Sequence, residues 1–499
     1  MQWSRGELRQ TAEQAINKAI QAFRQKAVEH NCHLAVGTVK CKGDTWLNSA
    51  LLFDPTGNVI CNTTKHFLWH FDGNWFSPGS EFGVCETPWG KVGILICADG
   101  RPPEVARILR LKGTRILLDL TNWTTTGKEP SRLTNPQVEY IMRTRALENQ
   151  MWVVAANKVG IELASVAYCG SSCVINPEGE IVARASSDKA ETLFVNIPLD
   201  EGVSGVLVDS RLNPVVDRKS KEYLILTEPT DSLPVYSTMK EELVPVEKAV
   251  LAAAVQVTEA EAKKAGGLFT AGTLKRLVNI LAEEKVRLVV FPELSHSVPQ
   301  IAFQALFHAV LDESKNNPNM VLLLTGPESY EGKTYKSTFV VSCGEVIGKY
   351  RKVHLESTEK PVLCPGDQGL PVFSTPVGNI GIMLGYEGLL PEVARVLTLK
   401  GAELIAWPAS FAVDRHELLA KTRAVENRVF VVVANSSSEG IGESIIVDPA
   451  GIVLAQAFRE RTLIASAFCN LSAARLKAII PGTDAILDRQ PLAYRELIG

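Results

Sequence analysis

Runs of apolar residues alternate with amphipathic stretches along most of this 499-residue chain. Uninterrupted apolar runs of about five residues predict buried strands at residues 92–96, 115–120 and 152–156. The segments between these strands, residues 102–113 and 136–149, carry apolar side chains three and four positions apart, which predicts helices. Strands that alternate with helices indicate an α/β fold, with a mixed sheet flanked by helices.

The opening of the chain and the region after residue 245 differ in the elements that they predict first. The chain opens with a helix at residues 12–27 and continues with strands at residues 33–39, 47–53 and 59–61. The region after residue 245 begins with a strand, a helix and a strand, at residues 250–257, 273–284 and 286–291. The intervening residues, from about 200 to 245, are rich in proline, charge and turns, with one short strand predicted at 223–226.

The same landmarks occur twice along the chain and in the same order. They recur at offsets of 278 to 288 residues, and the pairs are Lys65 and Lys352, Pro78-Gly79 and Pro365-Gly366, Glu104 and Glu392, and the Arg-Ala-x-Glu-Asn segments at Arg145 and Arg423. So steady an offset indicates the duplication of a whole domain. We predict one domain at residues 1–245, with a connector from about 200, and a second at 246–499. By this alignment the first domain lacks the strand–helix–strand opening of the second.

Composition and charge exclude several classes of function. The net charge of -3 gives no positive surface for nucleic acid or for an anionic membrane. The first residues lack the apolar core of a signal peptide, and no apolar run reaches the roughly 18 residues of a membrane span, so we expect a cytoplasmic protein. Its ten dispersed cysteines are then expected to be reduced thiols. The expected partner is a small molecule, and neither a metal ion nor another cofactor is predicted.

One cysteine, Cys97, follows the predicted strand at residues 92–96 and precedes the helix that begins near Pro102. Ligands of α/β proteins bind at such strand ends, where a helix N-terminus stabilises an anion or a thiolate. The second copy has Gly385 at the corresponding position. From position alone, Cys97 is explained equally well as a small buried apolar residue.

Taken together, the repeated landmarks resemble the nitrilase superfamily of carbon–nitrogen hydrolases over nearly the whole chain. The resemblance rests on the segments Cys97-Ala-Asp-Gly-Arg-Pro-Pro-Glu104, Phe291-Pro-Glu293 and Tyr350-Arg-Lys352-Val-His-Leu, on both Arg-Ala-x-Glu-Asn segments, and on Asn157 and Asn435. It implies an α-β-β-α sandwich in each copy. Sandwiches of this family pair across a helical face, so we expect the two copies to form an internal pseudo-dimer, with a further homo-oligomer as an addition.

The resemblance also implies a chemistry based on a Cys, a Lys and a Glu. In this family the thiolate attacks the substrate carbon, the Glu transfers protons, and the Lys and a backbone N–H stabilise the tetrahedral stage. In the first copy the resemblance assigns Cys97 as nucleophile, Lys65 as cation and the Ala98 N–H as oxyanion donor. An accessory acid of some members falls on Asp72 in the first copy and on Glu359 in the second.

The general base of the first copy is the weakest of these assignments. The only acid in register is Glu7, 286 positions before Glu293, and the polar residues before it do not fit the buried strand that normally holds the base. An ordinary acid near the start of a helix is the alternative for Glu7. The second copy keeps Glu293, Lys352 and Glu359 but has Gly385, so we expect a degenerate and inactive site, retained as an ion pair or as a small binding pocket.

The residues after the nucleophile indicate the class of substrate. Nitrilases of the family tend to follow the cysteine with Trp-Glu, whereas amidases and N-carbamoyl hydrolases tend towards the Cys-x-Asp-x-Arg-x-Pro-Glu pattern that begins here at Cys97. We therefore expect an amidase or N-carbamoyl hydrolase that acts on a small amide or carbamoyl substrate through its first domain. The alternatives are a catalytically inactive pseudoenzyme or scaffold, and the release of ammonia from glutamine for a separate acceptor enzyme.

Overall fold

The computed structural model describes residues 5–43, 45–126, 129, 133–198, 212–243, 245, 249–257, 270–294, 298–410, 415–436, 442–459 and 461–499, apart from the side chains of residues 5–9 and 42. The chain forms two compact units. Unit 1 comprises Met1–Ser204, Ala478–Asp484 and Asp488–Leu497, and unit 2 comprises Gly205–Lys477, Ala485–Leu487 and Ile498–Gly499. The expected start of the connector, near residue 200, lies outside the described residues.

These units differ in their boundaries from the expected domains, 1–245 and 246–499, because each includes the segment that follows the other copy. Residues after the first copy belong to unit 2, where the 3-10 helix η4 (Ser220–Thr227) packs on the helix α8 (Pro391–Leu399). Residues at the end of the chain belong to unit 1, where the 3-10 helix η10 (Arg495–Leu497) packs on the helix α2 (Pro103–Leu111). Such contacts join residues far apart in the sequence, which local patterns do not reveal.

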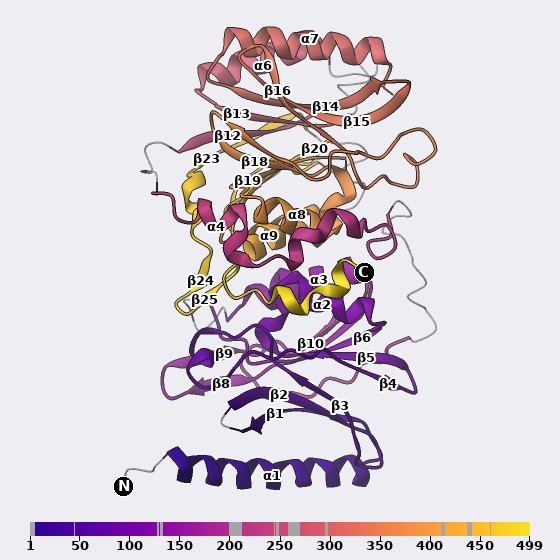
Figure 1. Cartoon of the computed structure of the whole chain (residues 1–499), viewed down its shortest axis with the longest axis vertical. Helices are drawn as coiled ribbons and strands as arrows, with labels where there is room; N and C mark the ends of the chain where they lie inside the picture. The colour runs from indigo at the N-terminus through magenta and orange to yellow at the C-terminus, as the bar shows by residue number, and fades with distance from the viewer. Residues whose placement is uncertain are drawn as a thin grey trace. The chain divides into compact units, whose positions relative to one another are not determined.

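Unit 1 is layered, with helices outside and sheets inside (Figure 1). The helix α1 (Arg5–Glu29) packs on an antiparallel sheet of β1 (Leu34–Lys42), β2 (Thr45–Phe53) and β3 (Val59–Thr64). The second sheet has the order β11-β10-β7-β6-β5-β4, and its strands are β4 (Gly83–Thr87), β5 (Gly90–Leu95), β6 (Ile116–Leu120), β7 (Trp152–Ala156), β10 (Cys173–Ile175) and β11 (Ile181–Arg184). The helices α2 and α3 (Met142–Asn149) cover its outer face, and β8 (Val159–Glu162) and β9 (Val166–Cys169) form a separate hairpin.

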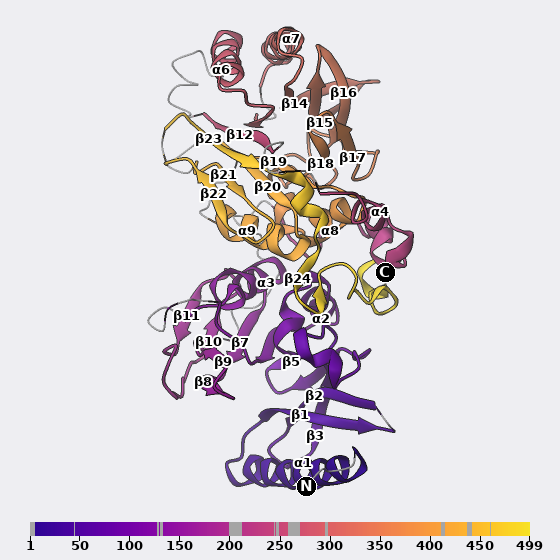
Figure 2. The same cartoon turned by 90° about the vertical axis from the view of Figure 1, so that its left-hand side faces the viewer.

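Unit 2 repeats these layers, as the side view in Figure 2 also shows. Its first sheet has the order β16-β15-β14-β13-β12-β23, from β12 (Val250–Gln256), β13 (Leu288–Glu293), β14 (Val321–Tyr330), β15 (Lys333–Ser342), β16 (Glu345–Arg351) and β23 (Leu463–Cys469). The helices of its outer layer are α6 (Ala271–Glu283) and α7 (Gln300–Asn316). The second sheet has the order β17-β18-β19-β20-β21-β22, from β17 (Val372–Thr375), β18 (Gly378–Ile382), β19 (Leu404–Ala409), β20 (Phe430–Asn435), β21 (Ile445–Val447) and β22 (Val453–Gln456), with α8 and α9 (His416–Asn427) outside.

The expected α/β class and the α-β-β-α arrangement of each copy are therefore confirmed. Both sandwiches hold apolar side chains between their sheets. The strands β13, β19 and β20 of unit 2 are buried at every position, whereas β6 and β7 of unit 1 are partly exposed. All ten cysteines are free thiols. Among the helices in the described ranges, none has both the length and the apolar character needed to cross a membrane.

The first sheets of the two units differ in size. Within the described residues β1 pairs only with β2, whereas the corresponding strand β14 of unit 2 pairs with both β13 and β15. Residues 191–198 of unit 1 form no strand, whereas β23 of unit 2 pairs with β12 along its whole length. In unit 2 the strand β23 pairs with β12, and residues 191–198 of unit 1 have no counterpart of β12 to pair with among the described residues. The missing neighbour of β1 and the missing strand at residues 191–198 are therefore explained together.

The strand expected at residues 223–226 is wrong, because this segment is the 3-10 helix η4. Its two buried side chains, Tyr223 and Leu226, are three positions apart. That spacing matches one turn of a 3-10 helix, and a four-residue apolar run does not distinguish such a turn from a short strand.

Candidate active site

The thiol of Cys97 lies at a turn between a strand and a helix, as expected. The strand β5 ends at Leu95, and Cys97 opens the 3-10 helix η2 (Cys97–Gly100) with a left-handed φ of 54°. Its N–H donates to Asp119 Oδ1 at 3.0 Å, and its carbonyl accepts from Gln137 Nε2 at 2.8 Å. Both peptide groups of Cys97 are thus fixed by buried side chains, while the side chain remains partly exposed.

A buried carboxylate connects this turn to the loop that carries Lys65. Asp99 accepts hydrogen bonds from the N–H groups of His66 at 2.9 Å and Phe67 at 2.7 Å through one oxygen. Its other oxygen accepts from the N–H of Ile96 at 3.1 Å. Burial raises the pKa of Asp99, and it raises the pKa of Asp119 well above its usual range. Asp99 and Asp119, which hold the Cys97 turn, therefore favour their neutral forms more than exposed acids do.

Lys65 follows β3 and forms a buried ion pair. Its Nζ donates to Asp72 Oδ2 at 2.5 Å, and its side chain is only 4% exposed. Burial alone lowers the pKa of Lys65, but the negative charges of the Cys97 thiolate and of Asp72 raise it above its ordinary value. The ammonium group is therefore retained next to the thiol.

The Pro-Gly landmark near Lys65 has a steric explanation. The N–H of Gly79 donates to the carbonyl of Lys65 at 2.7 Å, and a Cβ at Gly79 would lie 2.6 Å from the backbone oxygen of Thr64. Gly366 has the same position in unit 2, where a Cβ would lie 2.2 Å from the backbone oxygen of Arg351. Only glycine permits this close approach, which holds each lysine at its strand end.

Cys97, Lys65 and Asp72 line one cavity of about 770 Å³. The cavity wall also includes residues of β1, the residues that follow β6, and aromatic side chains from the loop after Lys65 and from β9. Asn48, Trp69 and Ile480 are among the lining residues. A volume of this size is typical of sites for small molecules.

The structure thus brings together three of the residues that the sequence assigned to the first copy. Ala98, the expected oxyanion donor, is the second residue of η2 and is 1% exposed. Glu7, the weak candidate for the base, lies in the first turn of α1 and not on a buried strand. Its side chain lies outside the described residues, so the structure does not place its carboxylate at the cavity.

The corresponding residues of unit 2 form a buried network of charges. Lys336 Nζ contacts Glu293 Oε1 at 2.6 Å and also pairs with Glu359. Lys352 Nζ contacts Glu356 Oε1 at 2.7 Å and Glu359 Oε2 at 2.9 Å. All five side chains are buried. Each carboxylate of this network therefore has an ammonium group beside it.

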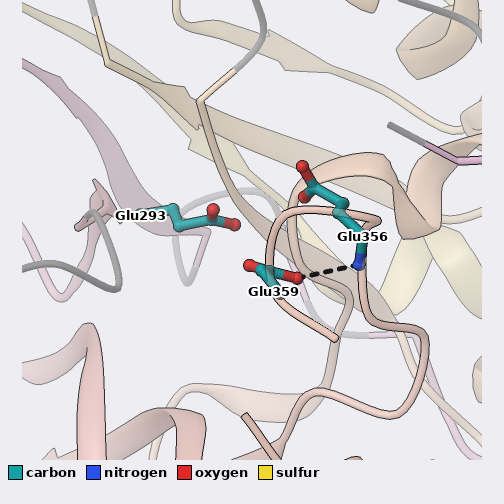
Figure 3. A group of neighbouring side chains, drawn as sticks. All are labelled: Glu293, Glu356 and Glu359. Atoms are coloured by element: carbon teal, nitrogen blue, oxygen red, sulfur yellow. Dashed lines mark hydrogen bonds between the residues drawn. The ribbon is translucent and has the colours of Figure 1, made fainter. Parts of the chain in front are cut away.

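The three glutamates lie close enough together to suggest a metal site, with ligand atoms within 4.8 Å of one another. Figure 3 shows Glu293 directed towards Glu359, whose carboxylate also accepts the N–H of Glu356 at 3.0 Å. Burial raises the pKa of Glu293; it also acts on Glu359, but Lys352 and Lys336 lower the pKa of Glu359 to about 2. Because the two lysines occupy the places of a cation, the cluster is explained as an ion network.

Gly385 takes the place of Cys97 in the second copy and has nearly the same backbone conformation. Its φ is 50°, against 54° at Cys97. A Cβ at Gly385 would lie 2.8 Å from Glu293 Oε2 and 3.2 Å from Lys352 Nζ. The charged side chains of unit 2 therefore fill the space in which a nucleophile would lie.

Sequence reasoning missed four residues of these sites. Lys336 and Glu356 complete the network of unit 2, and Asp119 and Gln137 hold the Cys97 turn. Asp119 is an acid inside the strand predicted at residues 115–120, and that anomaly was a usable signal. Lys336 lies in β15, a strand that was not predicted from the sequence. Gln137 acts across 40 positions of sequence, and nothing local marks it.

Comparison with known proteins places this fold in a family. Residues 2–204 and 251–477 match the carbon–nitrogen hydrolase family. A nitrilase of Pyrococcus abyssi is 35% identical over 180 residues, which are 35% of this chain and 69% of that protein. The omega-amidase NIT2 of Xenopus tropicalis is 31% identical over 189 residues, which are 36% of this chain and 66% of that protein. The crystal structure of Saccharomyces cerevisiae Nit3, from branch 10 of the nitrilase superfamily, is 24% identical with a TM-score of 0.41, and covers 49% of this chain and 98% of Nit3.

The duplicated sandwich and the two matched segments define a tandem carbon–nitrogen hydrolase. Within that class the chain belongs to the nitrilase superfamily, which confirms the resemblance seen in the sequence.

Proposed function

We propose that this protein hydrolyses a small amide or carbamoyl compound in the cavity of unit 1, through a thioester on Cys97, and that unit 2 is catalytically inactive. The observation that carries the proposal is that Cys97 and the Lys65–Asp72 ion pair line the same cavity. The pattern from Cys97 to Glu104 and the omega-amidase relatives favour an amide as the substrate. Because another relative is named a nitrilase, nitriles are the substrates to compare with amides.

The proposed reaction has two stages. In the first, the Cys97 thiol gives its proton to a carboxylate and attacks the amide carbon, and Lys65 and the Ala98 N–H stabilise the oxyanion. The carboxylic acid then protonates the leaving nitrogen, the carbon–nitrogen bond breaks, and ammonia or an amine departs from the thioester. In the second, water gives a proton to the same carboxylate and attacks the thioester, which releases the acid and the protonated thiol.

Asp72 is our candidate for the carboxylate that carries these protons. It lines the cavity with Cys97, it accepts a hydrogen bond from Lys65, and its side chain is 23% exposed, so that water reaches it. Glu7 is the second candidate, from its register with Glu293 in the sequence. The proposed Asp72 mechanism requires no strand equivalent to β13.

The inactivity of unit 2 follows from two features. Gly385 offers no nucleophile, and the buried network of Lys336, Lys352 and three glutamates neutralises the groups that would transfer protons. In unit 1, Asn48 and Trp69 stand where unit 2 has Lys336 and Glu356, as the pairing of the strands and the spacing from each lysine show. The side chains at these two positions are neutral, so no further charged group pairs with Lys65 and Asp72 from there, and the cavity beside them stays unfilled.

The experiment measures ammonia release from a panel of short amides, omega-amides of dicarboxylic acids, N-carbamoyl amino acids and nitriles. We expect hydrolysis of one amide or carbamoyl class by the wild-type protein. Cys97→Ser should lose at least about a thousandfold in kcat, and Asp72→Asn about a hundredfold to ten thousandfold. Cys343→Ser, which alters an exposed thiol of unit 2, is the matched control. Loss in Glu7→Gln with retained activity in Asp72→Asn would transfer the base to Glu7.

A scaffold without catalysis is the second candidate. It is favoured by the three-stranded sheet of unit 1, because in unit 2 the acid Glu293 is the last residue of β13, and β1 has no such neighbour among the described residues. Absence of turnover on every substrate, together with equal iodoacetamide labelling of Cys97 and Cys343, would support the scaffold.

A further inference from the structure

The end of the chain forms a small hairpin beside the cavity of unit 1. It consists of β24 (Ala478–Ile480) and β25 (Thr483–Asp484), and both strands belong to unit 1 although they follow the second copy in sequence. Ile480 lines the same cavity as Cys97 and Lys65. A segment more than 370 residues from the nucleophile thus contributes to the wall of its site.

This hairpin holds the loop that carries Asp72. The N–H of His70 donates to Thr483 Oγ1 at 2.7 Å, and the ring nitrogen Nδ1 of His70 donates to the carbonyl of Pro481 at 2.9 Å. Gln490, further along the same segment, donates from Nε2 to the carbonyl of His66 at 2.6 Å. Thr483 is 3% exposed, so its hydroxyl has little water to replace this bond.

His70 needs such support because of its backbone conformation. Its φ is 49°, in the left-handed region that non-glycine residues seldom adopt. His70 opens the 3-10 helix η1 (His70–Asn74), in which Asp72 accepts the N–H of Trp69 at 3.0 Å and the ammonium group of Lys65 at 2.5 Å. The direction of η1, and with it the position of the Asp72 carboxylate, therefore depends on the conformation of His70.

The loop is thus held from two sides. Asp99 binds its beginning to the Cys97 turn, and the hairpin binds it at His70, two residues before Asp72. In unit 2 the segment after the first copy also contacts the loop that follows the lysine, because Tyr223 Oη and His354 Nε2 are 2.7 Å apart. The unit 2 site beside that loop is filled by charged side chains.

We infer that the C-terminal hairpin is a positioning element of the unit 1 site: Thr483 and Pro481 fix the loop that orients Asp72, and Ile480 limits the size of the acyl group that the cavity accepts. This inference rests on the proposed function for its effect on turnover. The second copy then contributes to catalysis even if its own site is inactive, because the hairpin that follows it in the sequence completes the site of unit 1.

The test compares Thr483→Val, Ile480→Ala and Ile480→Trp in the full chain. Thr483→Val keeps the shape of the side chain but removes the acceptor of the His70 N–H, so kcat should fall about tenfold with little change in KM. Ile480→Ala should raise kcat/KM for longer acyl groups relative to shorter ones by about tenfold, and Ile480→Trp should change this ratio in the opposite direction. Leu492→Ala, 81% exposed in the same segment, is the control and should change neither quantity.

Hydrogen exchange separates this inference from the proposed function. The amides of residues 66–76 should exchange faster in Thr483→Val than in the wild type and Leu492→Ala, whether or not the protein turns over substrate. Unchanged exchange, or unchanged kcat and acyl preference in an active protein, would overturn the inference. Absence of wild-type turnover together with faster exchange would refute the proposed function and leave the positioning role in place.

Discussion

Restoring a cysteine to the second copy is the sharpest test of why that copy is expected to be inactive. In Gly385→Cys the new residue keeps a φ near 50°, and its Cβ lies 2.8 Å from Glu293 Oε2, 3.0 Å from Glu356 Oε1 and 3.2 Å from Lys352 Nζ. The left-handed conformation costs about 1–2 kcal/mol for a residue with a Cβ. Moving side chains that are fixed by ion pairs adds about 1–3 kcal/mol, as for overpacking of a core. We therefore expect a loss of about 2–5 kcal/mol in the stability of unit 2.

The assay is urea unfolding monitored by hydrogen exchange of peptides from β19 and β20, because these peptides report on the stability of unit 2. Gly385→Ala shares the new Cβ and is the control for the steric part, so the difference between the two variants isolates the thiol. In a Cys97→Ala background, Gly385→Cys should not restore hydrolysis, because Lys336 and the three glutamates still fill the site. Recovered turnover, or no loss of stability in either Gly385 variant, would refute the view that charged side chains fill the unit 2 site.

Three other predictions concern unit 1. Lys65→Met should slow alkylation of Cys97 by iodoacetamide at pH 7 by about tenfold or more, since an ammonium group in the same cavity stabilises a thiolate. An unchanged rate of alkylation would show that Lys65 does not activate Cys97. Because burial raises the folded-state pKa of Asp119 above its ordinary 3.8, ionisation opposes folding as the pH rises above about 4; urea unfolding should show Asp119→Asn gaining on the wild type from there towards pH 7, by at most about 1.4 kcal/mol per pH unit, and the gain should vanish below pH 4. Glu148→Gln breaks an ion pair with Arg145, 2.6 Å long and 0% exposed on both sides, and should lower the free energy of unfolding by about 3–5 kcal/mol, whereas a change below 1 kcal/mol would contradict this account.

The elements that the sequence predicted well are those with an uninterrupted apolar run. The strand expected at residues 152–156 is β7 with the same bounds, because all five of its residues are apolar. Its burial is nevertheless uneven, since Trp152 and Val154 are only partly buried and Ala156 is exposed. The helix expected at residues 12–27 is present as α1 but begins at Arg5, in a stretch whose polar residues carry no apolar period. The position of Cys97 at a strand-to-helix turn followed from the apolar run and the prolines on either side of it.

The parts that the sequence did not predict depend on contacts across long stretches of chain. The exchange of tails between the units is such a case: Arg218 lies 2.7 Å from Glu392 in unit 2, and Arg489 lies 4.0 Å from Glu104 in unit 1. Each arginine has a tyrosine five positions later, so the two tails are themselves a repeat that alignment of the copies could have revealed. Their destinations have no local signal, because a tail can dock on either copy of a duplicated fold with similar contacts.

The most direct test of the central claim is the mass of the intact protein, measured after rapid acid quench during turnover of its best amide substrate. The account predicts an added acyl group on the wild-type protein, localised to the peptide that contains Cys97 and absent from Cys97→Ala. Hydrolysis that persists at the wild-type rate in Cys97→Ala, or an acyl group attached at another residue, would contradict it.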